Sequence, residues 1–447
     1  MTSTKVLQPW RCACSRTPDG VDKPSLTQFP CHLPYLLWRF YASDDSSHSR
    51  PLTGDGSAMI SPLTKDNSAI RPPMTGQEIR KLVKSLYGMH VANTKRLGGF
   101  DDSNWYIMVD STETSQPAPS EDNEFMFKVV SGRDSTQSAL ALFGAQIHIM
   151  QYLHRKKIVN VPLPIPTSSG KLIDMVNISF EDEHGELYEA NNIIRLQTFL
   201  PGVVYEDALT VKASVLGNIG ETCAYLHDSL KSYTKEIDAL RDHIPAWDLR
   251  NVPATRSWLS LIPDLKWRRF AEDVIQKFEE NVLRHLDKLT IGVVHGDLNN
   301  ENIILKKVES GREEEDPEYE FNGVIDFADA CLSYHIFDLA ICLTYFSMDS
   351  KQHHPLIAAG YVFNGYEKMR TLRDFELQLL SLCVVGRLVQ SNLYAYDQRA
   401  NASDERKNYE ELIQGKWSLA KLWWDTPVDE LFRLWGREGL ASTGNTS

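Results

Sequence analysis

Residues 291–330 constrain the fold of this chain more than any other stretch. They read IGVVHGDLNNENIIL, then a charged insert, then FNGVIDFADA. Three short apolar runs bounded by polar turns predict three successive β-strands. The loop between the first two runs carries His295, Asp297 and Asn302, and the third run ends at Asp326. We therefore expect carboxylate and amide side chains to gather where these strands end.

These side chains suit phosphoryl transfer from a nucleotide, in which catalysis is mostly positioning and electrostatic stabilisation. Asn302 and Asp326 offer the oxygen ligands that Mg²⁺ prefers. Asp297 precedes Asn302 by five residues and is placed to accept a hydrogen bond from the attacking hydroxyl. His295 is interpreted as packing and orienting the loop. An HGD tripeptide alone is weak, because turns are rich in Gly, Asp and Asn, but H-G-D-x4-N followed by I-D-F is far more specific.

The stretches HGDLNNEN and VIDFAD resemble the catalytic and metal-binding motifs of the aminoglycoside phosphotransferase family. Further similar stretches are DDSN at 101–104, FMFKV at 125–129, RLQTFLPG at 195–202, WDLRNVP at 247–253 and GRLVQS at 386–391. The resemblance implies an α+β, protein-kinase-like fold with two lobes, a small β-rich N-terminal one and a larger, mostly helical C-terminal one. Within the family the chain is most similar to the hydroxylysine kinases. This implies a Mg²⁺-dependent kinase that uses GTP (or ATP) to phosphorylate the hydroxyl of 5-hydroxy-L-lysine.

The chain divides into four parts. We expect a disordered leader or transit segment at 1–73, a nucleotide-binding lobe at 74–200, a catalytic and substrate lobe at 201–435, and a disordered tail at 436–447. The leader is rich in Ser, Pro, Thr and Asp and lacks periodicity. Thr75 followed by Glu78 predicts a capped helix start just beyond it. In the C-terminal lobe we expect helices at 213–230, 270–286 and 409–424, among others.

The leader also bears on localisation. Its stretch Arg39-Phe40-Tyr41-Ala42-Ser43 resembles a mitochondrial presequence cleavage site. Acidic residues and prolines interrupt any amphipathic helix in this segment. We therefore expect a cytoplasmic protein, with the mitochondrion as the alternative.

The N-terminal lobe supplies the expected nucleotide contacts. Gly98 and Gly99, followed by Ser103 and Asn104, resemble the hairpin that covers the nucleotide in this fold, although an ordinary hairpin would look the same. Lys128 lies inside an apolar strand and needs an anionic partner, which in a kinase-like lobe is the donor phosphates. The alternative is a lysine on a solvated edge strand. The strand containing Gln197 is expected to pass the nucleotide base.

One feature departs from the family. The helix predicted at 138–153 normally carries a glutamate that pairs with the strand lysine, but Gly144 occupies that position. No Asp or Glu occurs between Ser135 and Leu172. Gln146, or an acid from elsewhere in the chain, would have to substitute. A nucleotide-binding pseudokinase without turnover is therefore an alternative reading.

Three residues are candidates for contact with the substrate. Arg250 lies in the WDLRNVP stretch that shapes the substrate site in the family. Arg387 lies on a predicted helix and is suited to pair bidentately with a substrate carboxylate, although a structural salt bridge is an equal alternative. Asp329 is placed to hold a second metal or to cap Ser333.

Composition excludes several partners. The 447-residue chain has a net charge of -13 and no evident basic patch, which argues against a nucleic acid polymer. No apolar run approaches the ~20 residues that span a membrane. The expected partners are a nucleotide and a small hydroxylated amine or amino acid. A kinase for another amino alcohol, a sugar or an antibiotic is the alternative within the same fold.

Overall fold

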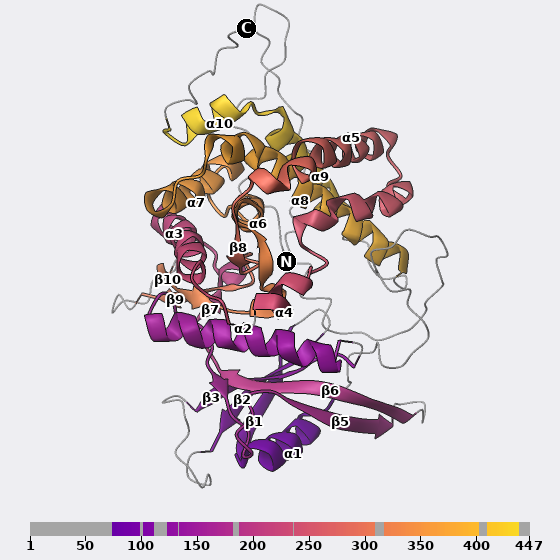
Figure 1. The fold of residues 1–447 in the computed structure, drawn as a ribbon, viewed down its shortest axis with the longest axis vertical. Coiled ribbons are helices and arrows are strands. Elements are labelled where there is room, and N and C mark those ends of the chain that lie inside the picture. The colour runs from indigo at the N-terminus through magenta and orange to yellow at the C-terminus, as the bar shows by residue number, and fades with distance from the viewer. Residues whose placement is uncertain are drawn as a thin grey trace, which may run out of the picture.

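The computed structural model describes residues 74–98, 102–110, 123–132, 134–181, 187–235, 237–308, 317–401 and 409–437. The predicted leader with its cleavage-like stretch, the tail from residue 438 onward and Gly99 lie outside these ranges. The described chain forms a sheet-rich part and a helix-rich part (Figure 1), so the expected two-lobed α+β fold is confirmed. The predicted boundary at 200–201 falls in the loop between strands β6 and β7.

A six-stranded antiparallel sheet forms the N-terminal lobe, with the order β1-β2-β3-β6-β4 and β5 paired to β6. Its strands are β1 (Val91–Arg96), β2 (Ser103–Val109), β3 (Glu124–Val129), β4 (Pro164–Ile165), β5 (Asp174–Glu181) and β6 (Leu187–Thr198). In the register, Asn104 lies opposite Lys128, and Lys128 lies opposite Arg195. Directly paired residues project from the same face, so these three side chains share one side of the sheet.

Helix α1 (Gly76–Tyr87) covers the opposite face of the sheet (Figure 1). The predicted capping box is present, since Thr75 and Glu78 bond each other's backbone N–H groups. The helix ends at Gly88, whose φ of 68° is a left-handed conformation that favours glycine. Its buried residues Ile79, Val83 and Tyr87 pack on the aromatic interior of the sheet.

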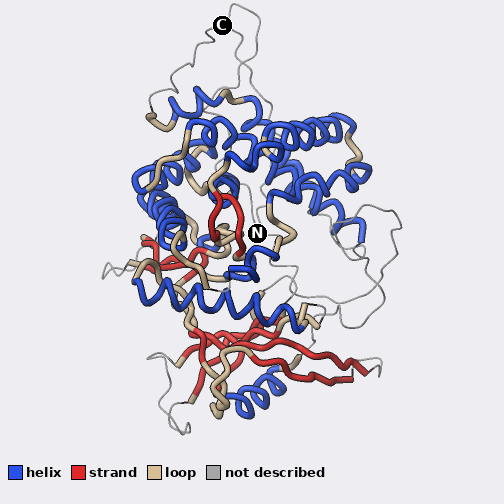
Figure 2. The backbone as a smooth tube through the Cα atoms, in the orientation of Figure 1, coloured by secondary structure: helices blue, strands red, loops and turns tan. Residues whose placement is uncertain are grey.

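Helix α2 (Gln137–Lys156) lies between the sheet and the helix-rich lobe (Figures 1 and 2). Phe143 packs against Val130 and Ile193 on the sheet side. Other residues of α2, such as Ile149 and Leu153, join the large apolar core of the C-terminal lobe. The helix therefore joins the two lobes through its packing.

Two small sheets lie where the lobes meet, one made of β10-β9-β7 and the other of β11-β8. Their strands are β7 (Val203–Val204), β8 (Ile291–Val294), β9 (Ile303–Lys307), β10 (Tyr319–Val324) and β11 (Cys331–Tyr334). Strands β8, β9 and β10 are the three that the sequence predicted. They place the HGD loop and the aspartate of I-D-F side by side.

Helices make up the rest of the C-terminal lobe (Figure 2). They are α3 (Ala213–Leu230), α4 (Ile237–Asp242), α5 (Leu265–Asn281), α6 (His335–Met348), α7 (Pro355–Met369), α8 (Asp374–Asn401), α9 (Tyr409–Asp425) and α10 (Val428–Leu434), with 3₁₀ segments at 205–207, 249–261, 283–288 and 327–329. Every residue of α6 is buried, which makes it the central helix of the lobe.

One expected helix has different bounds. The sequence predicted a helix at 270–286, but α5 begins earlier, because Asp264 caps the N–H of Lys266. It ends at Asn281, and a 3₁₀ segment follows that contains the non-helical residue His285. Apolar spacing alone did not reveal either the cap or the kink.

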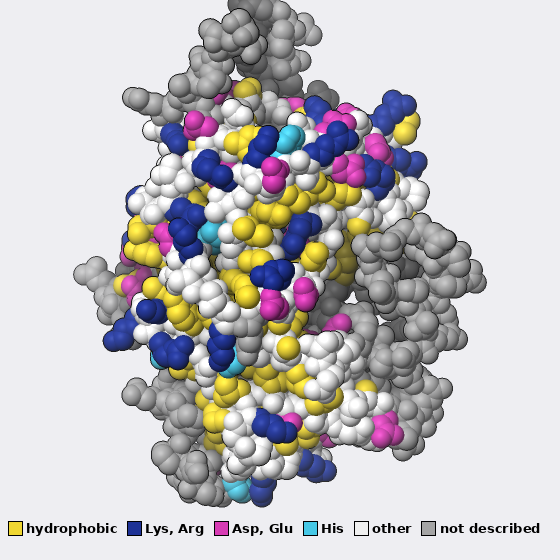
Figure 3. Space-filling view, viewed as in Figure 1, with side chains coloured by type: hydrophobic (Ala, Val, Ile, Leu, Met, Phe, Trp, Pro, Cys, Tyr) yellow, Lys and Arg dark blue, Asp and Glu magenta, His cyan; other side chains and the backbone are white. Residues whose placement is uncertain are grey.

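Basic and acidic side chains are mixed on the surface. On the face drawn in Figure 3, Lys and Arg side chains are interspersed with Asp and Glu rather than gathered in one basic patch. Among the described residues, none of the helices has the length and apolar character to cross a membrane.

Candidate active site

The HGD loop connects β8 to β9, and the side chain of Asp338 on α6 binds its backbone. The buried Asp338 carboxylate accepts hydrogen bonds from the N–H groups of Gly296 (2.9 Å) and His295 (3.3 Å). His227 of α3 lies 3.0 Å from the same carboxylate and is fully buried. Gly296 has a φ of 85°, and a Cβ there would lie 2.2 Å from the carbonyl oxygen of Asp329. Only glycine fits this close approach.

His295 orients the loop, as the sequence predicted. Its Nε2 lies 3.0 Å from the carbonyl oxygen of Ile325, which precedes Asp326. Its ring packs on Phe327, with the ring centroids 4.6 Å apart. His295 thus joins the HGD loop to the segment that follows β10.

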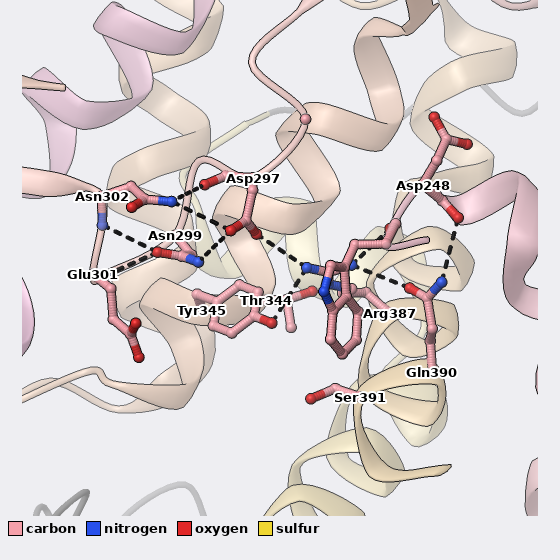
Figure 4. A network of polar contacts seen from close by, with 12 residues as sticks. Asp248, Asp297, Asn299, Glu301, Asn302, Thr344, Tyr345, Arg387, Gln390 and Ser391 are labelled. Carbon is pink, nitrogen blue, oxygen red and sulfur yellow. Dashed lines mark hydrogen bonds and ion pairs between the residues drawn. The ribbon is translucent and has the colours of Figure 1, made fainter. Parts of the chain in front are cut away.

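Asp297 lies at the centre of a polar network (Figure 4). Its Oδ2 accepts hydrogen bonds from the side-chain amides of Asn299 (2.9 Å) and Asn302 (3.3 Å), and its Oδ1 accepts one from Arg387 (3.2 Å). Burial raises the pKa of Asp297, against the lowering effect of Arg387 and His295. The carboxylate is therefore both fixed in direction and more basic than an ordinary aspartate.

Asn302 lies next to Asp297 and keeps its oxygen available. Its Nδ2 donates to the backbone carbonyl of Asp297 at 2.8 Å. Within the described chain, no hydrogen bond to the Asn302 Oδ1 occurs, so this oxygen is free for a cation. An amide oxygen together with the carboxylate of Asp326 is a donor set that suits Mg²⁺. The residues present therefore fit the expected metal.

Asp326 follows β10 in a left-handed conformation, with a φ of 58°. Its two carboxylate oxygens accept hydrogen bonds from the Nζ of Lys128 at 3.1 and 3.2 Å. Burial alone would raise the pKa of Asp326, but the positive charges of Lys128 and Arg195 outweigh it and hold the pKa at about 2. Lys128 and Asp326, which the sequence predicts to contact phosphate and metal, thus neutralise each other.

At two other acids around this centre, Asp329 and Glu301, no cation outweighs the effect of burial on the pKa. Burial and the negative charges of Asp297 and Asp326 raise the pKa of Asp329 to about 8. Burial and the neighbouring acids, Glu206 first among them, raise the pKa of Glu301 to about 8. The negative charges of these clustered acidic side chains repel one another. A bound divalent cation would reduce that repulsion.

Lys128 finds its second partner in the hairpin rather than in the helix. Asp102, which precedes β2, lies 3.4 Å from the Lys128 Nζ. Gln146 of α2 instead donates a 2.6 Å hydrogen bond to the carbonyl of Ala328 in the metal-binding loop. An acid from elsewhere thus substitutes for the helix glutamate whose position Gly144 occupies, and α2 contacts the site through the metal loop.

We expect Asp102→Asn to raise the KM for the donor nucleotide by about 2- to 10-fold, because one hydrogen bond to a charged group is weakened. The change in kcat should be small, since Lys128 keeps Asp326 as a neighbour. Steady-state kinetics with varied nucleotide measures both values. Asp174→Asn, which removes an exposed partner of Lys171, is the control and should leave the KM unchanged. An unchanged KM in the Asp102 variant would show that the hairpin acid does not support the lysine.

The predicted nucleotide-contacting residues of the hairpin divide between the two faces of the sheet. Asn104 shares the face of Lys128, and its side-chain amide donates to the carbonyl of Gly98 at 2.9 Å. Ser103 lies on the other face, where its hydroxyl accepts a hydrogen bond from the indole of Trp105. The structure therefore does not bring the Ser103 side chain to the site. Gln197 lies two residues from Arg195 on β6 and shares its face.

One of the expected substrate residues, Arg250, is engaged by other groups, and Asp329 does not contact Ser333. Arg250 pairs bidentately with Asp248 at 2.8 and 2.9 Å and also donates to the carbonyl of Leu332. Asp329 does not cap Ser333, because the Ser333 hydroxyl donates to Asp248 instead. Asp329 remains beside the metal-binding loop, while Arg250 holds the 3₁₀ segment at 249–261 against β11.

Arg387 forms a structural salt bridge, the alternative that the sequence left open. Its Nη2 bonds Asp297 and lies 3.3 Å from the Tyr345 hydroxyl, and its Nη1 donates to the carbonyl of Trp247 at 2.7 Å (Figure 4). The guanidinium also stacks over the Trp247 ring, 4.8 Å from the centroid. Arg387 therefore positions Asp297 and holds the WDLR loop beside it.

Sequence reasoning missed Asp102 and Arg195 as members of the charge network. Arg195 is 3% exposed, and its guanidinium lies over Phe143. Its Nε and Nη1 have no hydrogen-bond partner among the described residues. An arginine inside the apolar strand IIRLQTF was a usable signal, because it raises the same desolvation argument as Lys128. Asp102 gave no comparable signal, since acids are common in turns.

Comparison with known proteins identifies the family. A model of the phosphotransferase enzyme family, APH, matches residues 95–372. The chain belongs to this family. Hydroxylysine kinase of Xenopus laevis is 28% identical over 361 residues, which cover 77% of this chain and 92% of that protein. Hydroxylysine kinase of Danio rerio is 27% identical, covering 80% and 94%. This phosphotransferase is a small-molecule kinase that phosphorylates an alcohol, as expected.

Solved structures support the fold of the phosphotransferase. A complex of amicoumacin kinase with AMP-PNP, Ca²⁺ and Ami matches with a TM-score of 0.54 at 14% identity and covers 79% of this chain and 95% of that one. A microcompartment-associated aminopropanol kinase matches with a TM-score of 0.53 at 14% identity, covering 80% and 99%. At this identity the two structures carry information about the fold alone.

Proposed function

We propose that this phosphotransferase transfers the γ-phosphoryl group of GTP to the hydroxyl of 5-hydroxy-L-lysine. The main support is the similarity to hydroxylysine kinases over more than nine tenths of their length. The hydrogen bonds that fix the orientation of the Asp297 carboxylate support it further. The choice of GTP rests on the resemblance to that group of kinases. Mg²⁺ is proposed as the metal because the free oxygen of Asn302 and the carboxylate of Asp326 suit it.

Asp297 is proposed to act on the acceptor. Its carboxylate would accept the hydrogen bond of the substrate hydroxyl and take the proton as the hydroxyl oxygen forms its bond to the γ-phosphorus. The bond between the γ-phosphorus and the bridging oxygen of the β-phosphate breaks in the same step, and GDP is the leaving group. Arg387, Asn299 and Asn302 keep the carboxylate in one orientation during this step. The raised pKa of Asp297 favours proton acceptance.

Lys128 and its neighbours are proposed to act on the donor. The Lys128 ammonium would donate to the phosphates in place of its bond to Asp326, and Arg195 would add a second positive charge on the same face of the sheet. Bound Mg²⁺, held by Asn302 and Asp326, would neutralise charge on the phosphoryl oxygens. Both charges of the Lys128–Asp326 pair would thus find new partners when donor and metal bind.

The test is phosphate transfer by the purified full-length chain. GTP or ATP is supplied with Mg²⁺, and the acceptors are 5-hydroxy-L-lysine, homoserine, choline and an aminoglycoside. We expect transfer to 5-hydroxy-L-lysine, with a kcat/KM higher with GTP than with ATP. A higher kcat/KM for another acceptor would keep the mechanism and replace the substrate. Mg²⁺-dependent nucleotide binding without formation of any product would favour a pseudokinase. This alternative was suggested by Gly144, which occupies the position of the usual helix glutamate.

A further inference from the structure

Lys416 of α9 is a buried ammonium group with few partners. The residue is 4% exposed, and its Nζ donates a 3.0 Å hydrogen bond to the hydroxyl of Ser391 on α8. Nowhere in the described chain does a carboxylate lie within ion-pair distance of it. By contrast Lys421, one turn further along α9, pairs with Asp425 at the surface. Lys416 is therefore a charged group that the surrounding protein leaves without a counter-ion.

Burying the Lys416 ammonium without a counter-ion lowers the stability of the folded protein. Removing an ammonium from water is costly unless an anion or several acceptors replace the lost hydration, and one hydroxyl replaces only part of it. Burial, assisted by the positive charge of Arg387, lowers the pKa of Lys416 to about 8. An apolar side chain of similar length would pack at this position without that penalty. A lysine here is explained by a function rather than by packing.

The position of Lys416 connects it to Asp297. Ser391 follows Arg387 by four residues on α8, so the two side chains project from the same face, about one 5.4 Å turn apart. Figure 4 shows Arg387 and Ser391 on the same side of this helix, with Arg387 directed at Asp297. Glu301, in the loop that connects β8 to β9, raises the pKa of Lys416 against the effect of burial. The Lys416 ammonium is thus close enough to the loop that carries Asp297 to interact with its charges.

We infer that Lys416, with Ser391, binds the carboxylate of an amino-acid acceptor whose hydroxyl lies at Asp297. This inference rests on the proposed function and adds the residues that select an amino acid over an amino alcohol. In 5-hydroxy-L-lysine, four carbon–carbon bonds separate the hydroxyl-bearing carbon from the carboxylate carbon, which spans a distance of the order of one helical turn. The acceptor carboxylate supplies the counter-ion that Lys416 lacks. When an amino alcohol without a carboxylate binds, Lys416 still lacks a counter-ion.

The test compares acceptors that differ only in the carboxylate. 5-Hydroxy-L-lysine is paired with 1,5-diaminopentan-2-ol, and homoserine with 3-aminopropan-1-ol. We expect Lys416→Met to lower the kcat/KM ratio of each acid to its decarboxylated partner by about 10- to 100-fold, because charge-assisted hydrogen bonds are lost. The loss should appear in KM rather than kcat. The Tm should stay the same or rise, since a buried unpaired charge is removed.

Lys421→Met, on the same helix, is the matched control and should leave the ratio unchanged. Ser391→Ala provides a second variant and should lower the ratio less than Lys416→Met does. If Lys416→Met lowers the Tm and reduces both members of each pair equally, its role is structural and the inference is overturned.

A binding measurement separates this inference from the proposed function. If the wild-type chain transfers phosphate to none of the acceptors, the proposed function fails, but thermal shifts still report on the carboxylate site. A Tm increase with 5-hydroxy-L-lysine that is absent with 1,5-diaminopentan-2-ol and lost in Lys416→Met supports the site. Equal shifts with both ligands, or equal shifts in wild type and variant, overturn it.

Discussion

Asp297→Asn is expected to lower kcat by about 10²–10⁴-fold, the contribution of a positioned general base. An amide has the size of the carboxylate but accepts no proton from the attacking hydroxyl. Mg²⁺-nucleotide affinity should change little, because Asn302, Asp326 and Lys128 are intact. Steady-state kinetics measures the first effect and titration with a fluorescent nucleotide the second. Unchanged turnover would remove Asp297 from the mechanism.

The fold should persist in this variant. Arg387 loses an ion pair but keeps the carbonyl of Trp247 and the hydroxyl of Tyr345. Because burial raises the pKa of Asp297, removal of its charge offsets much of this loss. The free energy of unfolding should therefore fall by no more than about 1 kcal/mol. Glu376→Gln is the control. It replaces another buried carboxylate, which pairs with Arg373 and accepts the N–H of Thr290. This variant should lose stability without losing turnover.

Asp326→Asn is expected to have the second large effect. The structure places this carboxylate against Lys128, with Arg195 nearby, and the two cations hold its pKa at about 2. Its removal takes away a proposed metal ligand and leaves Asp102 as the remaining acidic partner of Lys128. We expect kcat to fall by about 10³-fold, in the upper part of the range of electrostatic contributions to catalysis. Nucleotide affinity should no longer depend on Mg²⁺, which isothermal titration with and without the metal will show.

The stability of the nucleotide-free protein provides an independent readout. Asp326→Asn should lower the Tm, because the ion pair with Lys128 is lost. Asp329→Asn is the matched variant three residues away. Burial raises the pKa of Asp329 to about 8, so its charge destabilises the folded protein at pH values above the ordinary carboxyl pKa, and its removal should leave the Tm unchanged or raise it. A Tm loss in Asp329→Asn together with none in Asp326→Asn would reverse the two roles.

Local patterns were enough to predict the catalytic centre. Asp297, Asn302 and Asp326 lie at the ends of consecutive strands, so their order along the chain already places them together. Lys128 was predicted because a lysine in an apolar strand requires an anion, an argument that involves no other part of the chain. The helices at 213–230 and 409–424 followed from apolar spacing and agree with α3 and α9.

Other features depended on information that local patterns lack. Ser103 and Asn104 are adjacent in a strand that is buried on both faces, so the apolar pattern did not reveal which of them shares the face of Lys128. The start of α5 depended on a single cap, and its end on a kink. The domain bounds and the localisation of the chain stay predictions.

The sequence by itself determined the two-lobed kinase-like fold and the residues proposed to bind metal and phosphate, because these are encoded in short strands and the loops that follow them. The tertiary structure decided which charges meet. Arg387 reaches Asp297 across 90 positions, Asp102 replaces an acid that α2 does not carry, and Lys416 lies buried beside Ser391. Such pairs form when helices and hairpins that are distant in the sequence pack together. Because the two partners lie far apart in the sequence, no local residue pattern predicts that they will meet.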